Sequence, residues 1–178
     1  VRDEQVNKMA KARGNVSDPH DIIDGVDLDT LIKKRTAGLN KEQANKVEKE
    51  VRKNYPAGIK SYCTDALRFT MAAMAAQGSD VKLSIDRVEG YRNFATKLWN
   101  ASRFAEMNEC VRQQAFDPRT AKQTINKWII GETEIAAKAV TAALEAYKFN
   151  EAAITAYEFV WGQFCDCLLY TSPSPRDR

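Results

Sequence analysis

The sequence predicts a mainly α-helical protein, and three observations support this fold class. Apolar residues recur every three or four positions along most of the chain, which is the period of an amphipathic helix. Residues that cap helices precede these runs, and glycine or proline follows them. Only Val81 to Leu83 has the composition of a strand, and three residues are too few to anchor a sheet. An apolar content of 44% is enough for a core.

Two short helices are predicted first. Ser17-Asp18-Pro19 offers a capping side chain and a proline for the first turn, and Gly25 stands where this helix should stop. The next helix should run from about Leu28 to Thr36 and end at Gly38.

The third and fourth helices are predicted from their caps. Asn40 can cap the third, which is mostly charged and is broken at Tyr55-Pro56. Thr64 or Asp65 can cap the fourth, an alanine-rich and strongly apolar helix that should end at Gly78.

Three longer helices follow, joined by short loops. Ser84 should cap a helix that reaches about Met107, a second should span about 121–147 around Gly131, and Asn150 should cap a third that ends at Asp166. In the first of these helices the expected apolar stripe is Val88, Tyr91, Ala95, Leu98, Ala101 or Ser102, and Ala105. In the second, the apolar contacts should come from Ile129, Ile130, Ile135, Ala139, Ala142 and Ala146. In the third, the stripe should be Ile154, Tyr157, Val160 or Trp161, and Phe164. Each helix keeps apolar surface to cover, so the bundle should be incomplete.

Composition excludes several classes of protein. No apolar run approaches the ~20 residues that span a bilayer, and the first ten residues lack a secretory signal, so a cytoplasmic location is expected. The four cysteines and His20 show no zinc spacing, so we expect reduced thiols and no metal site. A net charge of +3 does not by itself indicate a nucleic-acid partner.

A basic loop is the part of the sequence with the clearest chemistry. KMAKARGN places Lys8, Lys11 and Arg13 beside Gly14, just before a capped helix. Such mobile charges can follow phosphate oxygens, and glycine permits a sharp turn. Composition alone favours a solvated basic loop over a phosphate site.

The residues around this loop resemble a known family. KMAKARGNVSDPHDIIDG is similar to the KMSKS loop of class I aminoacyl-tRNA synthetases in its valyl-type context. The similarity continues through DLDTLIKKRTAGL, TDALRFTMAAMAAQGSDVKL, RVEGYRNFATKLWNASRF and EAYKFNEAAITAYEFVWGQFCD, so that matching blocks are spread from residue 8 to residue 166. KMSKS is shared by the isoleucyl, leucyl and methionyl enzymes, whereas the downstream blocks resemble the valyl group.

The resemblance implies a division of the chain. Residues 1–83 would be the end of a class I (Rossmann-type) catalytic domain with its linker region, and residues 84–166 a partial anticodon-binding helical bundle. Residues 167–178 abandon the helical pattern and resemble translated sequencing adaptor, so we expect a non-native tail there. Both ends look cut, and no HIGH-like signature occurs, so the chain should be an inactive fragment.

The resemblance also assigns site residues. Lys11 and Lys8 match the motif lysines, which in the family bind ATP phosphate and stabilise the transition state of adenylate formation. The motif loop continues through Met9, an expected apolar anchor, and Ala10, Ala12, Arg13, Gly14 and Asn15. Two motif serines are alanine here, arginine replaces a lysine, and Val6 stands where glycine is usual. These departures should impair loop positioning without changing the function.

A face of the 84–107 helix is the expected tRNA contact. It gathers Arg92, Asn93, Lys97, Asn100 and Arg103, with Thr96 and Trp99 among them. Such side chains can neutralise phosphates and stack on unpaired bases. The alternative is a solvated face with Trp99 tucked into the bundle.

The implied parent protein is an ATP-dependent ligase for valine. Its substrates would be valine, ATP with Mg2+ and the tRNA for valine; we expect a monomer that binds neither membrane nor DNA. The alternatives are the isoleucyl or leucyl enzyme, or a non-catalytic helical RNA-binding module.

Overall fold

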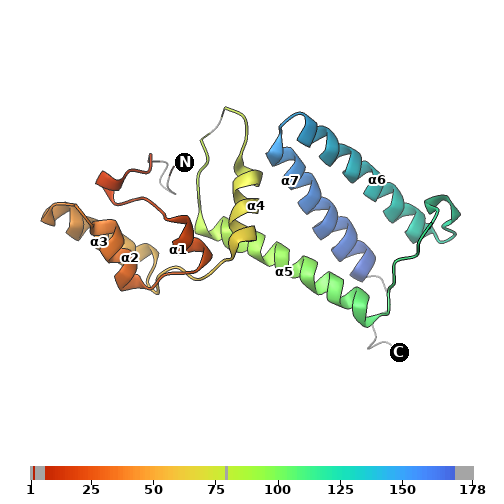
Figure 1. Cartoon of the computed structure of the whole chain (residues 1–178), viewed down its shortest axis with the longest axis horizontal. Coiled ribbons are helices and arrows are strands. Elements are labelled where there is room, and N and C mark those ends of the chain that lie inside the picture. The colour runs from red at the N-terminus through yellow and green to blue at the C-terminus, as the bar shows by residue number, and fades with distance from the viewer. Residues whose placement is uncertain (1, 3–6, 79, 171–178) are drawn as a thin grey trace. The chain divides into compact units, whose positions relative to one another are not determined.

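The computed structural model describes residues 2, 7–78 and 80–170, which form helices joined by turns (Figure 1). The chain divides into two compact units, Val1–Arg92 and Asn93–Arg178. Pairing between extended segments of the described residues is limited to isolated bridges. The prediction of a mainly α-helical fold is therefore confirmed.

Three helices open the first unit, and an aspartate or asparagine caps each of them. They are α1 (Pro19–Ile23), α2 (Leu28–Thr36) and α3 (Lys41–Asn54). Asp18, Asp27 and Asn40 accept hydrogen bonds from backbone N–H groups of the first turns, at 3.0, 2.9 and 2.8 Å. These predicted helices, and the cap at Asn40, are confirmed.

The core of the first unit collects one or two apolar side chains from each element. Helix α2 packs on α3, and α1 on α4 (Thr64–Met74). The buried residues are Ile22, Leu31, Val51, Ile59, Tyr62, Ala66, Leu67 and Val88. Because these positions lie on every helix from α1 to α5, their burial fixes the helices against one another.

The segment between α3 and α4 is bound to the end of α1 by backbone hydrogen bonds. Val26 and Ile59 exchange two N–H to O bonds of 2.8 Å each. Gly58 makes this approach possible, because a Cβ at its position would lie 2.2 Å from the carbonyl oxygen of Val26. The Ser61 hydroxyl adds a 2.7 Å bond to the carbonyl of Ile23.

Both predicted ends of helix α4 are wrong. It starts after Cys63, which has a φ of 67° and makes no side-chain cap, so capping by Thr64 or Asp65 is wrong. The chain enters this helix already bound to α1 through a 3.0 Å bond from the N–H of Tyr62 to the carbonyl of Ile22. The helix stops at Met74 rather than near Gly78, where tight turns among alanines take over.

Val81 to Leu83 does not form the expected strand. The segment makes an isolated bridge between Arg2 and Lys82. Arg2 donates from its N–H to the carbonyl of Val81 at 2.8 Å and accepts from Leu83 at 3.2 Å. A single paired residue gives no ladder, so the stretch remains a linker into the next helix.

Helix α5 (Ile85–Met107) starts in the first unit and continues into the second, with the predicted bounds. Val88 is fully buried, and the rings of Tyr91 and Phe69 lie 4.9 Å apart. Further along, Ala95, Ala101 and Ala105 are half-buried as expected, but Leu98 is 40% exposed and Phe94, outside the predicted stripe, is buried. The predicted stripe is therefore only partly correct. Steps of three residues from Val88 to Phe94 rotate the buried face around the helix.

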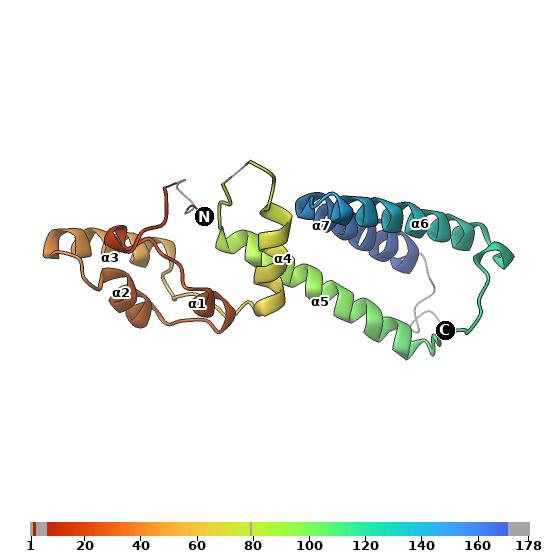
Figure 2. The same cartoon turned by 45° about the horizontal axis from the view of Figure 1, so that its top comes forward.

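The second unit contains a helical hairpin. Helices α6 (Thr124–Glu145) and α7 (Phe149–Glu158) lie side by side in both views (Figures 1 and 2). Near their turn, Ala143, Ala152 and Ala153 are buried, because small side chains let two helices approach closely. The predicted cap at Asn150 is wrong, since α7 has already begun at Phe149.

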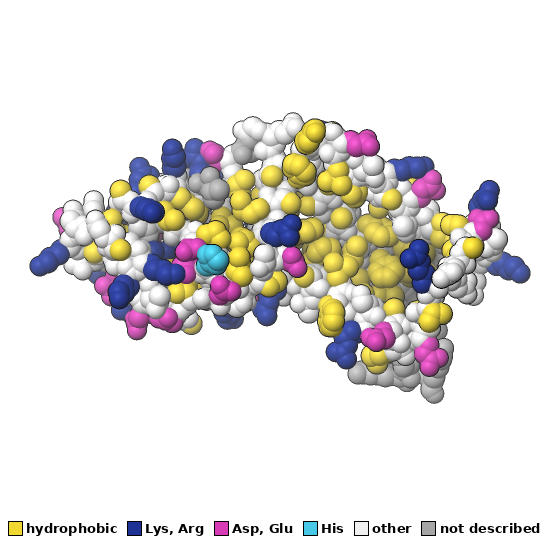
Figure 3. Space-filling model, in the orientation of Figure 1, with side chains coloured by type: hydrophobic (Ala, Val, Ile, Leu, Met, Phe, Trp, Pro, Cys, Tyr) yellow, Lys and Arg dark blue, Asp and Glu magenta, His cyan; other side chains and the backbone are white. Residues whose placement is uncertain are grey.

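The apolar stripe expected on α6 is only partly correct. Ile129 and Ile130 are half-buried, but Ile135 is 64% exposed and Ala139, Ala142 and Ala146 are exposed as well. The helix begins at Thr124, after the short 3-10 turn η2 (Pro118–Thr120), rather than near residue 121. Figure 3 shows hydrophobic side chains at the surface of the second unit, as an incomplete bundle would have.

Helix α7 continues as a π-helical segment, η3 (Phe159–Leu169). The helix therefore runs past Asp166, and the expected end at that residue is wrong. Residues 171–178 of the expected non-native tail lie outside the described residues. No helix in the described part of the chain has both the length and the apolar character needed to cross a membrane.

Candidate functional site

The basic loop is a short turn with a defined backbone. Ala10 is extended, residues Lys11–Arg13 form a 3-10 turn (η1), and Gly14 is left-handed with a φ of 66°. The turn closes through bonds from the N–H of Arg13 to the Ala10 carbonyl, 2.9 Å, and from Gly14 to Lys11, 3.0 Å. Lys11 and Arg13 are therefore displayed by an ordered turn.

The Asn15 side chain ties the two arms of this loop together. Its Oδ1 accepts from the N–H of Ala10 at 2.9 Å, and its Nδ2 donates to the carbonyl of Lys8 at 3.3 Å. Asn15 belongs to the predicted motif loop, but this cross-link was not predicted. Its amide holds the segment that carries Lys8 against the turn that carries Lys11.

Gly14 seats the loop on helices α2 and α3. A Cβ at this buried glycine would lie 2.6 Å from the carbonyl oxygen of Arg35 and 3.1 Å from both methyl groups of Val47. Only glycine tolerates both this contact and the left-handed backbone. The loop is thus fixed to the helices behind it.

The two motif lysines are exposed on this fixed loop. Near Lys8, Arg2 Nε lies 2.6 Å from Asp80 Oδ2, and this ion pair lowers the pKa of Asp80. Lys8 adds a weaker attraction of the same sign. Ala10 is half-buried and Ala12 exposed, whereas Val6 lies outside the described residues. The structure brings Lys8 and Lys11 onto one loop with their charges open to solvent.

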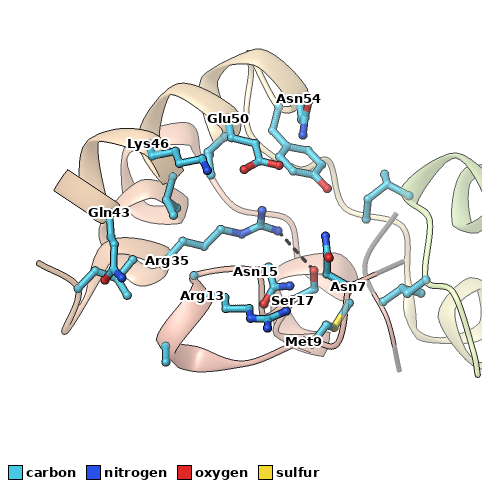
Figure 4. Close-up of a pocket in the computed structure, with 18 residues that line it drawn as sticks. Asn7, Met9, Arg13, Asn15, Ser17, Arg35, Gln43, Lys46, Glu50 and Asn54 are labelled. Carbon is cyan, nitrogen blue, oxygen red and sulfur yellow. Dashed lines mark hydrogen bonds between the residues drawn. The ribbon is translucent and has the colours of Figure 1, made fainter. Parts of the chain in front are cut away.

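A polar pocket of about 390 Å³ lies between the loop and helices α2 and α3 (Figure 4). Met9 and Arg13 line it from the loop, and Arg35 reaches into it from α2. The guanidinium of Arg35 lies 5.0 Å from the ring centre of Tyr55, and its Nη2 donates to Ser17 Oγ at 3.4 Å. Sequence reasoning missed Arg35, because nothing distinguishes it from its basic neighbours Lys33 and Lys34.

The predicted RNA-facing residues of α5 are mostly open to solvent. Arg92 is exposed in the first unit, and Asn93, Asn100 and Arg103 are exposed in the second. Trp99 is 66% exposed, so the alternative of a tryptophan tucked into the bundle is wrong. Thr96, Trp99 and Arg103, at intervals of three and four, share one side of the helix.

Lys97 differs from the rest of this set, because other residues of the second unit already bind it. Its Nζ lies 2.5 Å from Asp166 Oδ1 and 3.9 Å from the ring centre of Trp161. That ring stacks on Tyr157, with centroids 5.5 Å apart. The Lys97 ammonium is therefore held inside its own unit, and its partners are too far along the sequence to be predicted.

The chain matches two families of known proteins. Residues 1–84 match the family described as tRNA synthetases class I (I, L, M and V), and residues 126–175 match the anticodon-binding domain of tRNA ligase. Among curated proteins, a valine--tRNA ligase of Acinetobacter baylyi (strain ATCC 33305 / BD413 / ADP1) is 48% identical over 168 residues. This alignment covers 93% of the chain but only 17% of the relative.

Proposed function

Because the chain belongs to the class I tRNA synthetases, we propose that it is part of a valine–tRNA ligase. In this proposal the first unit holds the triphosphate of ATP, and the second unit binds the tRNA for valine. The observation that supports it most is the exposure of Lys8 and Lys11 on a loop that Asn15 and Gly14 fix in place.

The loop's chemistry fits adenylate formation. A carboxylate oxygen of valine attacks the α-phosphorus of ATP, and the bond to the bridging oxygen of the β-phosphate breaks, so pyrophosphate leaves. Negative charge grows on the departing oxygens. The ammonium groups of Lys8 and Lys11 would stabilise that charge, because a fixed cation costs little reorganisation at the moment of reaction.

Mg2+ would arrive with ATP. Among the described residues, no group of three His, Cys, Asp or Glu side chains is placed to hold a metal ion. The phosphate oxygens of ATP are themselves ligands that Mg2+ prefers. We therefore assign the motif lysines to the phosphates and assign no residue of this chain to the metal.

The exposed face of α5 would contact tRNA next to the matched anticodon-binding segment. In the second unit, Arg103 offers a charge for phosphate, Asn93 and Asn100 offer amide groups, and Trp99 offers a flat ring for an unpaired base. We leave Lys97 out of the direct contacts, because Asp166 and Trp161 already bind it. The isolated chain should bind tRNA weakly and should not activate valine.

Amino-acid specificity decides between this proposal and its alternatives. ATP–pyrophosphate exchange should be measured on the intact gene product with valine, isoleucine and leucine in turn. We expect valine to give the highest kcat/KM. Preference for isoleucine or leucine would select another enzyme of the same class, and no exchange with any amino acid would favour a non-catalytic RNA-binding module.

A further inference from the structure

We propose that the pocket behind the basic loop is a second phosphate site, centred on Arg35 and separate from Lys8 and Lys11. This inference goes beyond the ligase proposal and does not depend on it. It concerns the residues that line one cavity of the first unit, between η1, α2 and α3 (Figure 4).

Arg35 has a hydrogen-bond donor without an acceptor among the described residues. Within that part of the chain, its buried Nε has no hydrogen-bond partner, and its Nη2 makes a long 3.4 Å bond to Ser17. A guanidinium carries five N–H donors and cannot lose its charge. A buried donor without an acceptor is unfavourable, so an acceptor that enters the pocket is stabilised.

Arg52 shows what a satisfied arginine looks like in the same unit. Its Nε donates to Glu48 Oε1 at 2.9 Å, and its Nη2 lies 2.9 Å from the same oxygen. Arg52 is exposed, yet its Nε has an acceptor, whereas Arg35 is half-buried and its Nε has none among the described residues. The contrast makes Arg52 the matched control.

The described residues that line the pocket carry more positive than negative charge. Arg13, Arg35 and Lys46 line it, against the single acidic residue Glu50 among the described lining residues. An excess of positive charge favours an anionic ligand, most strongly the dianion of a phosphate monoester. The Tyr55 ring lies against the Arg35 guanidinium and favours one orientation of that group. The parallel N–H donors of a guanidinium match two oxygens of one phosphate.

The pocket is also large enough for a small ligand. A volume of about 390 Å³ lies in the range of small-molecule sites. It exceeds what one phosphate group fills, so the group would belong to a larger ligand. The phosphate could be that of a small metabolite or a phosphodiester of RNA, and both present the same oxygens to Arg35.

The test follows the arginine Nε–Hε signals by 15N NMR in the 178-residue chain. Inorganic phosphate, pyrophosphate and a short oligoribonucleotide are added separately at constant ionic strength, with acetate as the carboxylate control. We expect the Arg35 signal to shift and saturate with a Kd on the order of millimolar, while the Arg52 signal stays still. A response to phosphate or pyrophosphate alone indicates a small ligand, and a response to the oligoribonucleotide alone indicates RNA.

Variants separate this pocket from the motif lysines. Arg35→Lys keeps the charge but loses the planar fork, so binding, now followed on the Nε–Hε signal of Arg13 in the same pocket, should weaken about tenfold or more. Arg52→Lys should not change it. Lys46→Gln, at the exposed rim, should weaken binding without affecting the fold. The double variant Lys8→Ala, Lys11→Ala should leave the Arg35 response intact. An unresponsive Arg35 signal, an equal response to acetate, or loss of the response in the lysine variant would overturn the proposal.

Discussion

The Oδ1 atom of Asn15 lies 2.9 Å from the backbone nitrogen of Ala10, and this bond closes the loop that carries both motif lysines. The same amide donates to the carbonyl of Lys8. One side chain therefore fixes the spacing between the arms of the loop.

Replacing Asn15 should reduce activity through loop position. Asn15→Ala removes both bonds, each worth about 0.5–1.5 kcal/mol, so we expect valine-dependent ATP–pyrophosphate exchange in the intact ligase to fall about tenfold. Asn15→Asp keeps the acceptor for the N–H of Ala10 but loses the donor to the carbonyl of Lys8. Its exchange rate should therefore lie between those of the unmodified enzyme and Asn15→Ala. Unchanged exchange in Asn15→Ala would show that the loop does not need this cross-link.

Gly14 should be intolerant of any side chain. Gly14→Ala places a Cβ 2.6 Å from the Arg35 carbonyl at a left-handed backbone, so we expect a loss of more than about 2 kcal/mol in the free energy of unfolding. Gly90→Ala is the control, because its Cβ would meet nothing within 4 Å inside α5, and alanine should stabilise the helix. Urea unfolding followed by circular dichroism measures both changes.

Asp27 should make the first unit sensitive to acid. Hydrogen bonds from Thr30 lower the pKa of this capping carboxyl below its value in the unfolded chain. Its contribution is therefore present above the unfolded pKa, near 4, and is lost as the pH falls through the lower, folded pKa. Asparagine also caps helices but does not titrate in this pH range. Asp27→Asn should therefore make the free energy of unfolding depend less on pH below about 4. If the free energy of unfolding of Asp27→Asn fell with pH as steeply as that of the unmodified protein, Asp27 would not be the cause.

Substitutions of Lys97 and Arg103 should have different effects, although both residues were predicted as tRNA contacts. The change at Lys97 should lower stability, and the change at Arg103 should weaken RNA binding. Lys97→Met removes the cation from Trp161 and Asp166 and should destabilise the second unit by about 1 kcal/mol. Arg103→Gln should leave thermal unfolding unchanged while weakening tRNA binding and reducing its salt dependence by about one ion. The reverse pattern would assign the RNA contact to Lys97.

Local signals predicted the helices of the first unit better than their packing. Asp18, Asn40 and the glycines act within one turn, so their effects are visible in the sequence. The unusual start of α4 at Cys63 depends on bonds to α1 some forty residues earlier, and the exposure of Leu98 and Ile135 depends on which helices lie beside them. No local pattern carries that information.

In the candidate site too, residues of a local motif were predicted and residues that depend on distant contacts were not. Lys8 and Lys11 were predicted because the motif is contiguous, and the structure places them on one loop. Arg35 and the pair formed by Lys97 and Trp161 escaped prediction, because each depends on a contact between segments that are distant in sequence. The role of Asn15 is local, but its amide geometry appears only once the turn is built.

In the proposed function, Lys8 and Lys11 stabilise the triphosphate of ATP during valine activation. The most direct measurement is the single-turnover rate of valyl-adenylate formation in the intact ligase carrying Lys8→Ala and Lys11→Ala, with Lys49→Ala, an exposed lysine of α3, as the control. Loss of two charge-assisted contacts of about 1.5–3 kcal/mol each predicts at least a hundredfold slower rate, with the control unchanged. A rate equal to that of the unmodified enzyme would contradict the claim.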